Sequence, residues 1–334
     1  MAPFTYGIWI AVSALAGMLL LIVECRKGAL KKGTASWLAL FSLPLALFGA
    51  RLCFCLSRFS WFMEKGLGWL FSIQDGGLMM YGALAGLLLS ALLTSRVTSQ
   101  PFGKILDAAA APGMLTLALG RIGDLAAGLG YGWPIGDWFS VDAMDPDEFS
   151  GMSLFHLEDA SFFERLPFAV EDNYYGDMRW AVCILVGVIG LVLCAVLLGM
   201  RGRKAGDRGI MGIAMTAVLT VVCESLRQDD VTRWGVAGVV KAGEVISAVV
   251  LLLCFLICVL RMEKPRKPSH IWPYGALFVS SMGLVMAMEF ALEKKIPFLT
   301  WMPMDVCYLL VMAASADMVL MIGEVWKRSA TDKK

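Results

Sequence analysis

The chain alternates long apolar runs with short polar segments that carry most of its charge. A helix needs roughly 20 apolar residues to cross the hydrocarbon core of a bilayer, since it rises about 1.5 Å per residue. By that measure the sequence predicts about nine membrane-spanning helices in an all-α polytopic membrane protein. Their expected bounds are 6–24, 36–56, 76–95, 105–129, 178–200, 210–226, 239–260, 272–292 and 300–325.

Lysine and arginine collect on one side of this arrangement. The first, third, fifth and seventh connecting segments and the C-terminal tail are all basic, as residues 201–208 and 261–267 illustrate. Because cytoplasmic loops are enriched in these residues, the pattern predicts an outside N-terminus and a cytoplasmic C-terminus. The start of the chain lacks a basic segment before its first apolar run, so we expect no cleavable signal peptide.

Two of the predicted outside segments have unusual compositions. Residues 57–75 are rich in aromatic side chains and are expected to lie in the membrane interface as an amphipathic segment. Residues 130–177 combine many acidic side chains with aromatic ones, which a disordered segment would lack. We expect a small folded head there. It could attract a basic peptide, although a solvated acidic surface explains the same composition.

Composition agrees with a membrane protein and argues against other classes. Hydrophobic residues make up 58% of the chain, and 29 Lys and Arg nearly balance 28 Asp and Glu. This balance gives no indication of nucleic-acid binding. The nine cysteines lie mostly within apolar runs without a Cys-x-x-Cys pair, and the two histidines are far apart. We therefore expect no disulfide framework and no metal site.

Five of the predicted spans carry a polar side chain near their outer end. Counting helix rise from the predicted bounds places these groups either roughly 21–28 Å above the inner end or about 8 Å below the outer end. Charges at such depth are costly and are functional candidates by default. The residues are Arg51, Tyr81, Arg121, Asp124, Glu224 and Glu244. Their common level predicts one polar pocket in the outer third of the membrane, suited to a lipid with a polar head.

Two charge pairs within this set share a helix face. Arg121 and Asp124 are three residues apart, as are Glu224 and Arg227. Arginine binds phosphate through two parallel hydrogen bonds, so Arg121 with Arg51 or Arg227 could hold a lipid phosphate. Glu224 could orient an arginine or act as a base. Local ion pairs that staple helix ends explain the same spacing.

Three acidic residues of the last two runs have no predicted role beyond helix packing or binding a partner. They are Glu289, Asp305 and Asp317.

Two stretches resemble motifs of the prolipoprotein diacylglyceryl transferase family. Residues 119–132 are similar to the family's Gly-Arg-x-Gly-Asn motif through Gly120, Arg121 and Gly123, with Asp124 in place of the Asn. Ala127 and Leu129 stand where the family has a further Asn and a Glu. Residues 76–86 resemble Gly-Gly-x-x-x-(His or Tyr)-Gly-Gly. There Tyr81 takes the place of the catalytic residue, and Gly82 and Gly86 also form a small-xxx-small face for close helix packing.

Two further stretches extend the resemblance. Residues 224–228 look like the family's Glu-x-x-Arg-Gln, with Thr216 and Thr220 where the family has a Tyr and an Arg. Residues 242–247 are similar to Gly-Gln-x-x-Ser, with Glu244 in place of the Gln. The family's His-Pro-x-Gln-Leu-Tyr-Glu stretch has no counterpart. The resemblance covers about residues 6–260.

The resemblance implies a seven-span transferase-like core in the bacterial plasma membrane. On this interpretation residues 1–261 form the core and include the head at 130–177. A basic linker at 262–270, an added two-span hairpin at 271–326 and a basic tail at 327–334 follow.

The implied reaction moves a diacylglyceryl group from phosphatidylglycerol to the lipobox cysteine of a prolipoprotein signal peptide. A thioether forms and glycerol phosphate leaves. The partners would be these two substrates and the lipid bilayer, and the reaction needs no metal or cofactor.

The resemblance and the pocket together assign roles. Arg121 would hold the phosphate, Tyr81 would act as base or hydrogen-bond donor, and Glu224 would give electrostatic support. The expected substrate-binding residues are Arg51, Gly77, Gly82, Gly120, Gly123, Asp124, Arg227 and Glu244.

The replaced polar residues also fit a second class, a catalytically inactive or altered homologue that binds lipid or a lipoprotein partner. A transporter ranks last, because the charges share one outer level and the sequence shows no inverted repeat.

Overall fold

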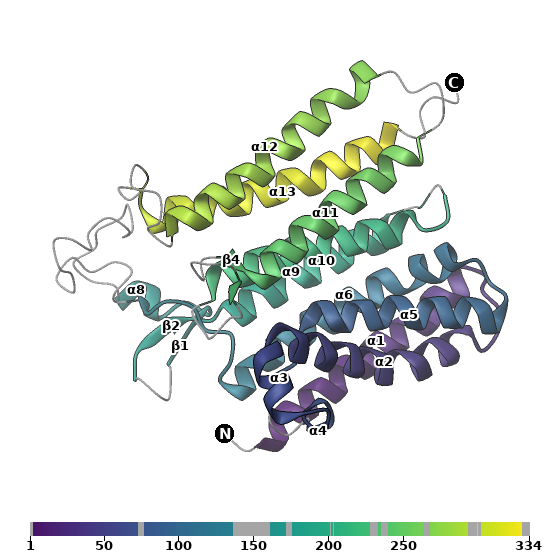
Figure 1. Ribbon diagram of the computed structural model, residues 1–334, viewed down its shortest axis with the longest axis horizontal. Coiled ribbons are helices and arrows are strands. Elements are labelled where there is room, and N and C mark those ends of the chain that lie inside the picture. The colour runs from purple at the N-terminus through teal and green to yellow at the C-terminus, as the bar shows by residue number, and fades with distance from the viewer. Residues whose placement is uncertain are drawn as a thin grey trace. The chain divides into compact units, whose positions relative to one another are not determined.

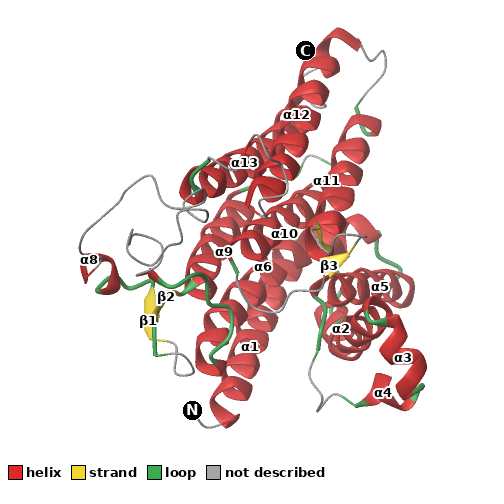
Figure 2. Cartoon of the chain, turned by 60° about the vertical axis from the view of Figure 1, so that its left-hand side comes forward, coloured by secondary structure: helices red, strands yellow, loops and turns green. Residues whose placement is uncertain are grey.

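The computed structural model describes residues 3–72, 77–135, 161–171, 176–200, 202, 204–227, 233–234, 240–262, 268–292, 299 and 302–328. Helices dominate this part of the chain (Figure 2). Nine of the described helices are long and apolar enough to cross a membrane. The protein is therefore a multi-pass, all-α membrane protein, which confirms the predicted fold class.

The nine long helices follow the predicted order (Figure 1). They are α1 (Pro3–Lys27), α2 (Thr34–Ser57), α5 (Met80–Thr98), α6 (Phe102–Ala127), α9 (Val182–Gly199), α10 (Asp207–Leu226), α11 (Ala242–Leu260), α12 (Pro268–Leu292) and α13 (Met304–Arg328). The aromatic segment after α2 forms two short helices, α3 (Phe59–Lys65) and α4 (Gly68–Phe71). Its expected place in the membrane interface stays a prediction.

Four helices begin later than predicted, and one of them is α13, which begins at Met304 and not at residue 300. Residue Gly77 has a φ of 79°, which interrupts a helix, so α5 begins at Met80. The strands β2 (Met178–Trp180) and β4 (Val240–Lys241) occupy the expected starts of α9 and α11. Their backbone groups pair antiparallel with β1 (Ala169–Glu171) and β3 (Arg233–Trp234). Tyr81 and Glu244 therefore lie in the first turn of their helices. The predicted bounds had placed both residues deeper in their spans.

The predicted head is described only in part. Besides β1 and β2, the short helix α8 (Ser161–Glu164) belongs to it. Residues 136–160 and 172–175, which carry most of its acidic side chains, lie outside the described residues.

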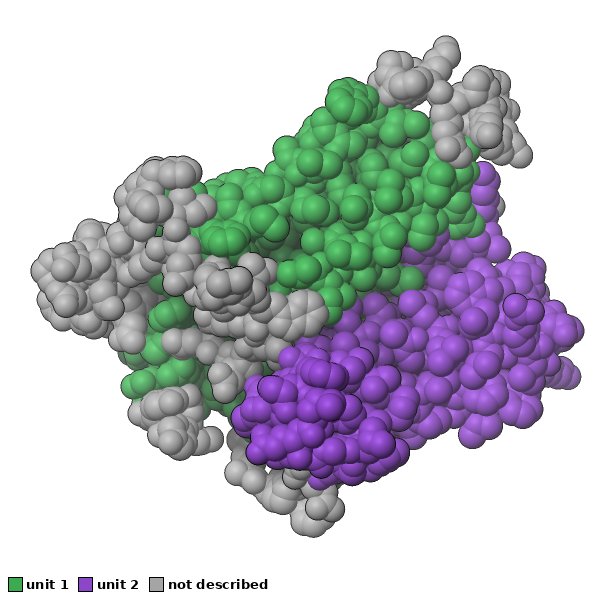
Figure 3. All heavy atoms as spheres, in the orientation of Figure 1, with its two compact units in different colours: residues 1–14, 114–196, 211–334 green, residues 15–113, 197–210 purple. Residues whose placement is uncertain are grey.

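The chain divides into two compact units (Figure 3). Unit 1 comprises residues 1–14, 114–196 and 211–334, and unit 2 comprises residues 15–113 and 197–210. Each is described by itself. The predicted domain boundaries follow the order of the chain and stay a prediction.

Unit 2 is built on the close pair α2 and α5. A side chain at Gly82 or Gly86 would strike the α2 backbone, at the carbonyls of Gly49 and Leu45. These glycines therefore set the distance between the two helices, as the small-xxx-small pattern predicts. At the other end of the unit, Asp107 accepts hydrogen bonds from two backbone N–H groups at the start of α10, at 2.7 and 3.0 Å.

Unit 1 includes the two helices beyond the predicted seven-span core. α12 and α13 pack along one another, and the Ser281 hydroxyl of α12 donates to Asp317 of α13 at 2.7 Å. Stacked rings of Phe255 and Phe278, with centroids 4.7 Å apart, join α12 to α11. The outer faces of α12 and α13 expose large apolar side chains, such as Val279 and Leu309, as lipid-facing helices do.

None of the nine cysteines, all of which are described, forms a disulfide.

Candidate active site

Arg121 lies in the last two turns of α6, where the sequence predicts a phosphate-binding residue. Its Nη1 donates to Asp124 Oδ2 at 3.1 Å, across one turn of the helix. The other carboxylate oxygen, Oδ1, lies 3.3 Å from the hydroxyl of Tyr6, which donates to it from α1. The side chains of Arg121 and Asp124 are 19% and 13% exposed. The carboxylate therefore fixes one edge of the guanidinium in a largely buried position.

The glycines of this stretch have different roles. A Cβ at Gly123 would lie 2.9 Å from the Cβ of Trp9, so Gly123 lets α1 approach α6 closely. At Gly120 a Cβ would meet nothing within 4 Å. Gly120 therefore leaves open space one residue before Arg121. Sequence reasoning missed Tyr6, although an outside N-terminus places it level with the end of α6.

A second nominated arginine also belongs to unit 1. Arg227 directly follows α10, one turn after Cys223. Arg121 and Arg227 thus lie in the same unit, whereas Arg51 does not. That Arg121 and Arg227 bind one phosphate stays a prediction.

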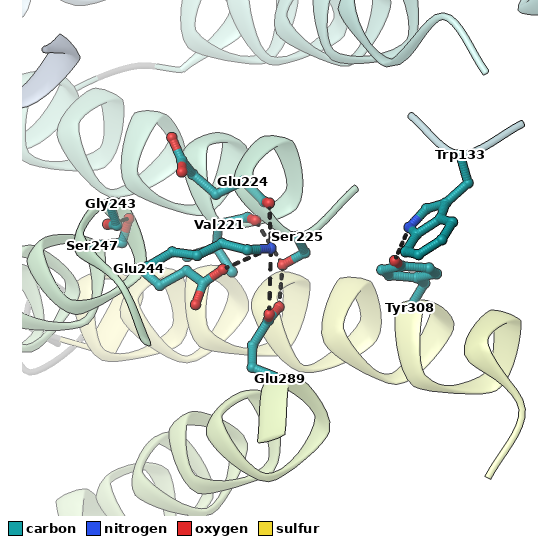
Figure 4. Close-up of polar contacts among 10 residues, drawn as sticks. Trp133, Val221, Glu224, Ser225, Gly243, Glu244, Ser247, Glu289 and Tyr308 are labelled. Atoms are coloured by element: carbon teal, nitrogen blue, oxygen red, sulfur yellow. Dashed lines mark hydrogen bonds and ion pairs between the residues drawn. The ribbon is translucent and has the colours of Figure 1, made fainter. Parts of the chain in front are cut away.

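Glu224 and Glu244 lie where α10 ends and α11 begins (Figure 4). The Glu224 side chain passes directly over Gly243, where an added Cβ would be 2.9 Å from its Cδ and 3.2 Å from its Oε1. Lys241 Nζ donates to the main-chain oxygen of Glu224 at 2.7 Å and pairs with Glu244 Oε1 at 3.7 Å. Sequence reasoning nominated both glutamates but missed the lysine that links them.

Helix α12 adds another carboxylate to this group. Glu289 Oε2 lies 3.8 Å from Lys241 Nζ, and Glu289 Oε1 accepts a hydrogen bond from the hydroxyl of Ser225. Figure 4 shows Glu289 facing Ser225 across the space between the helices. Among the described residues, the resulting group holds one lysine among carboxylates, and no three side chains are arranged to bind a metal ion.

The remaining nominated residues belong to unit 2. Arg51 is buried and donates to three main-chain oxygens, those of Gly77 at 3.1 Å, Trp69 at 2.9 Å and Ser72 at 2.6 Å. Its guanidinium also lies 5.5 Å from the ring centroid of Phe54. These contacts tie Trp69, Ser72 and Gly77 to α2.

Tyr81 is 8% exposed, in the first turn of α5. Because Arg51 and Tyr81 lie in unit 2, the expectation that they share a pocket with Arg121 and Glu224 stays a prediction.

Comparison with known proteins identifies the family of this chain. The model of the prolipoprotein diacylglyceryl transferases matches residues 3–260. The chain belongs to this family. A phosphatidylglycerol–prolipoprotein diacylglyceryl transferase of Listeria welshimeri is 32% identical over 267 residues, covering 80% of this chain and 88% of that protein. One from Bacillus velezensis is 25% identical over 259 residues, covering 78% and 88%.

As a member of the transferase family, the chain departs from the resembled pattern near the middle of α10. Thr216 and Thr220 stand where the pattern has a Tyr and an Arg. Their hydroxyls donate to carbonyls of their own helix, each at 2.9 Å, on Gly212 and Thr216. Such bonds occupy the hydroxyls locally. Two hydroxyls that hydrogen-bond within their own helix therefore stand where the pattern has an aromatic and a charged side chain.

The family match also separates the added helices from the core. It ends at residue 260, so α12, with Glu289, and α13 lie beyond it.

Proposed function

We propose that this chain transfers the diacylglyceryl group of phosphatidylglycerol to the cysteine thiol of a prolipoprotein signal peptide. The thiolate sulfur attacks the glycerol carbon that bears the phosphate ester. A C–S bond forms as the C–O bond breaks, and glycerol phosphate leaves with the bonding electron pair. The thiol proton passes to a base of the site or to the departing phosphate. Family membership and similarity to a named transferase over 80% of this chain support this reaction.

The observation that carries the proposal is the placement of Arg121 near the end of α6, where Asp124 holds its guanidinium beside the open space at Gly120. Asp124 engages only Nη1 of Arg121, and a guanidinium has five donors. The remaining donors can bind phosphate oxygens, and their charge stabilises the negative charge that grows on the leaving group. The open space beside Gly120 admits a substrate at this point.

Other nominated residues take supporting roles in this proposal. Asp124 holds the Arg121 guanidinium. Glu224 and Glu244 supply negative charge at the other end of the site. Tyr81 serves as base or hydrogen-bond donor toward the thiol. We assign Arg51 a structural role, because its donors bind the main-chain oxygens of residues 69, 72 and 77.

The basic segments orient the chain in a bacterial plasma membrane with its N-terminus outside. Glu224, in the last turn of α10, would then lie toward the outer leaflet.

The test is transfer itself. The chain is expressed in a bacterial strain depleted of its own transferase, and labelled phosphatidylglycerol is followed into a peptide that carries a lipobox cysteine. We expect the wild type to label the peptide and Arg121→Ala to abolish labelling. Arg96→Ala, at the end of α5, is the matched control and should leave transfer unchanged.

Two outcomes would contradict the proposal in different ways. A chain that reaches the membrane in good yield but labels no peptide would be the non-catalytic homologue that binds lipid or a lipoprotein partner. Labelling that persists in Arg121→Ala would leave the reaction standing and refute the assigned phosphate site.

A further inference from the structure

Helix α12 lies beyond the residues that match the family, yet it reaches the candidate active site. Glu289 lies one turn before the end of α12. It accepts a hydrogen bond from Ser225, the neighbour of Glu224 on α10, and it pairs with Lys241 at the start of α11. Both partners belong to the matched core. The added helix therefore touches the core at the two helix ends that carry Glu224 and Glu244 (Figure 4).

Lys241 transmits this contact to the site. Its Nζ donates to the main-chain oxygen of Glu224 at 2.7 Å. That carbonyl is one of the last four of α10, which have no partner within the helix. A lysine that satisfies such a carbonyl fixes the end of the helix. The same ammonium lies between the carboxylates of Glu244 and Glu289, at 3.7 and 3.8 Å.

Burial makes these contacts strong restraints. The side chains of Lys241, Glu244 and Glu289 are 9%, 8% and 10% exposed, so none of the charges can turn to water. Removal of one partner of a buried pair leaves the other uncompensated, and the remaining groups rearrange. On its far side the Glu224 side chain is bounded by Gly243. The end of α10 is thus held through its main chain by Lys241 and through Ser225 by Glu289.

We propose that Glu289 is a positioning residue of the transferase site, supplied by the added hairpin, which holds Glu224 and Glu244 in place through Ser225 and Lys241. The inference rests on the proposed function. A simple staple between α12 and the core would use the same contacts, so the test must separate positioning from stability.

The hairpin contains a matched control. Asp317 of α13 accepts a hydrogen bond from Ser281 of α12 at 2.7 Å, a contact within the hairpin itself. Asp317→Asn weakens the hairpin at a site away from the α10 and α11 ends. Glu289→Ala removes the core contact, and Glu289→Gln retains an acceptor for Ser225 but loses the charge that pairs with Lys241.

The full-length variants are reconstituted in vesicles that contain phosphatidylglycerol, and kcat and KM are measured with a lipobox peptide. We expect Glu289→Ala to lower kcat by roughly ten- to a hundredfold, the range for a displaced catalytic group, with a smaller change in KM. Glu289→Gln should fall between wild type and Ala. Lys241→Met combined with Glu289→Gln should lose less than the sum of the two single losses, because the two residues share one contact.

A second readout does not depend on turnover. Cys223 is 2% exposed and lies one residue before Glu224. If Glu289 holds the end of α10, Glu289→Ala should raise the rate at which a thiol reagent modifies Cys223, measured on its own peptide by mass spectrometry, and Asp317→Asn should not.

The outcomes separate cleanly. Equal losses of kcat in Glu289→Ala and Asp317→Asn at equal thermal stability would make Glu289 a staple and overturn the inference. So would wild-type kcat and Cys223 reactivity in a folded Glu289→Ala protein. Absence of transfer in the wild type would refute the proposed function alone. Cys223 reactivity would then decide whether Glu289 positions the helix end.

Discussion

Substitution of Gly243 by alanine tests the placement of Glu224 without touching its chemistry. The added Cβ would lie 2.9 Å from Glu224 Cδ and 3.0 Å from its Cγ. Carbon atoms in contact prefer separations of about 3.5–4.0 Å, so the glutamate must move by at least about 0.6 Å. A misplacement of about 1 Å at a catalytic group can cost about a hundredfold in rate. We therefore expect Gly243→Ala to lower kcat/KM by roughly tenfold or more, or about 1.4 kcal/mol in transition-state stabilisation.

Stability should change little in the same variant. Gly243 is the second residue of α11, where alanine is favoured over glycine by roughly 0.5–1 kcal/mol. This gain offsets much of the crowding. Gly283→Ala is the matched control, because a Cβ there meets nothing within 4 Å and the residue also lies in a long helix.

The assay is peptide labelling from phosphatidylglycerol, run beside thermal unfolding in detergent. A Gly243→Ala protein that transfers at the wild-type rate would show that the position of Glu224 does not matter for the reaction. Loss of rate accompanied by a large fall in melting temperature would point to a packing defect, and it would equally refute the reasoning.

Three other changes have definite expected results. Gly82→Leu forces α5 away from Gly49 and should destabilise the protein by about 1–3 kcal/mol, read as a lower melting temperature in detergent. Arg51→Lys should cost about 1–3 kcal/mol in the same measurement, because a single ammonium nitrogen cannot take the place of the two guanidinium nitrogens that reach the three carbonyls, while Arg96→Lys should not. Tyr6→Phe removes the donor to Asp124 and should slow peptide labelling by less than about tenfold, since such a bond contributes about 0.5–1.5 kcal/mol. An unchanged rate would show that Tyr6 does not support Asp124.

The number and order of the helices could be predicted because membrane spans are specified by apolar length alone. The starts of α5, α9 and α11 could not. Met178, Trp180 and Val240 are apolar and border the apolar runs, so composition did not distinguish these extended residues from the helices that follow. The errors matter because they fall on Tyr81 and Glu244, whose expected depth was counted from those starts.

Local spacing predicted part of the site. Arg121 and Asp124 are one helical turn apart, and the structure pairs them. Tyr6 could have been found from the predicted outside position of the N-terminus, which would put Tyr6 level with the end of α6. Lys241 could not, because it lies in a strand-to-helix junction whose direction depends on the fold around it.

The charges of the added hairpin show where sequence reasoning stops. Asp317 and Glu289 both lie within spans, where an unpaired charge is costly, so each must have a partner. That requirement follows from the sequence, but the partner does not. Asp317 accepts a hydrogen bond from Ser281 within the hairpin, and this contact joins only the two helices of the hairpin. Glu289 pairs with Ser225 and Lys241 in the core. These contacts offset the free-energy cost of its charge, and they lie at the ends of the helices that carry Glu224 and Glu244. The same rule applied to two acidic residues thus leads to a folding contact in one case and to a link with the site in the other, and only the packing of α12 against the core distinguishes them.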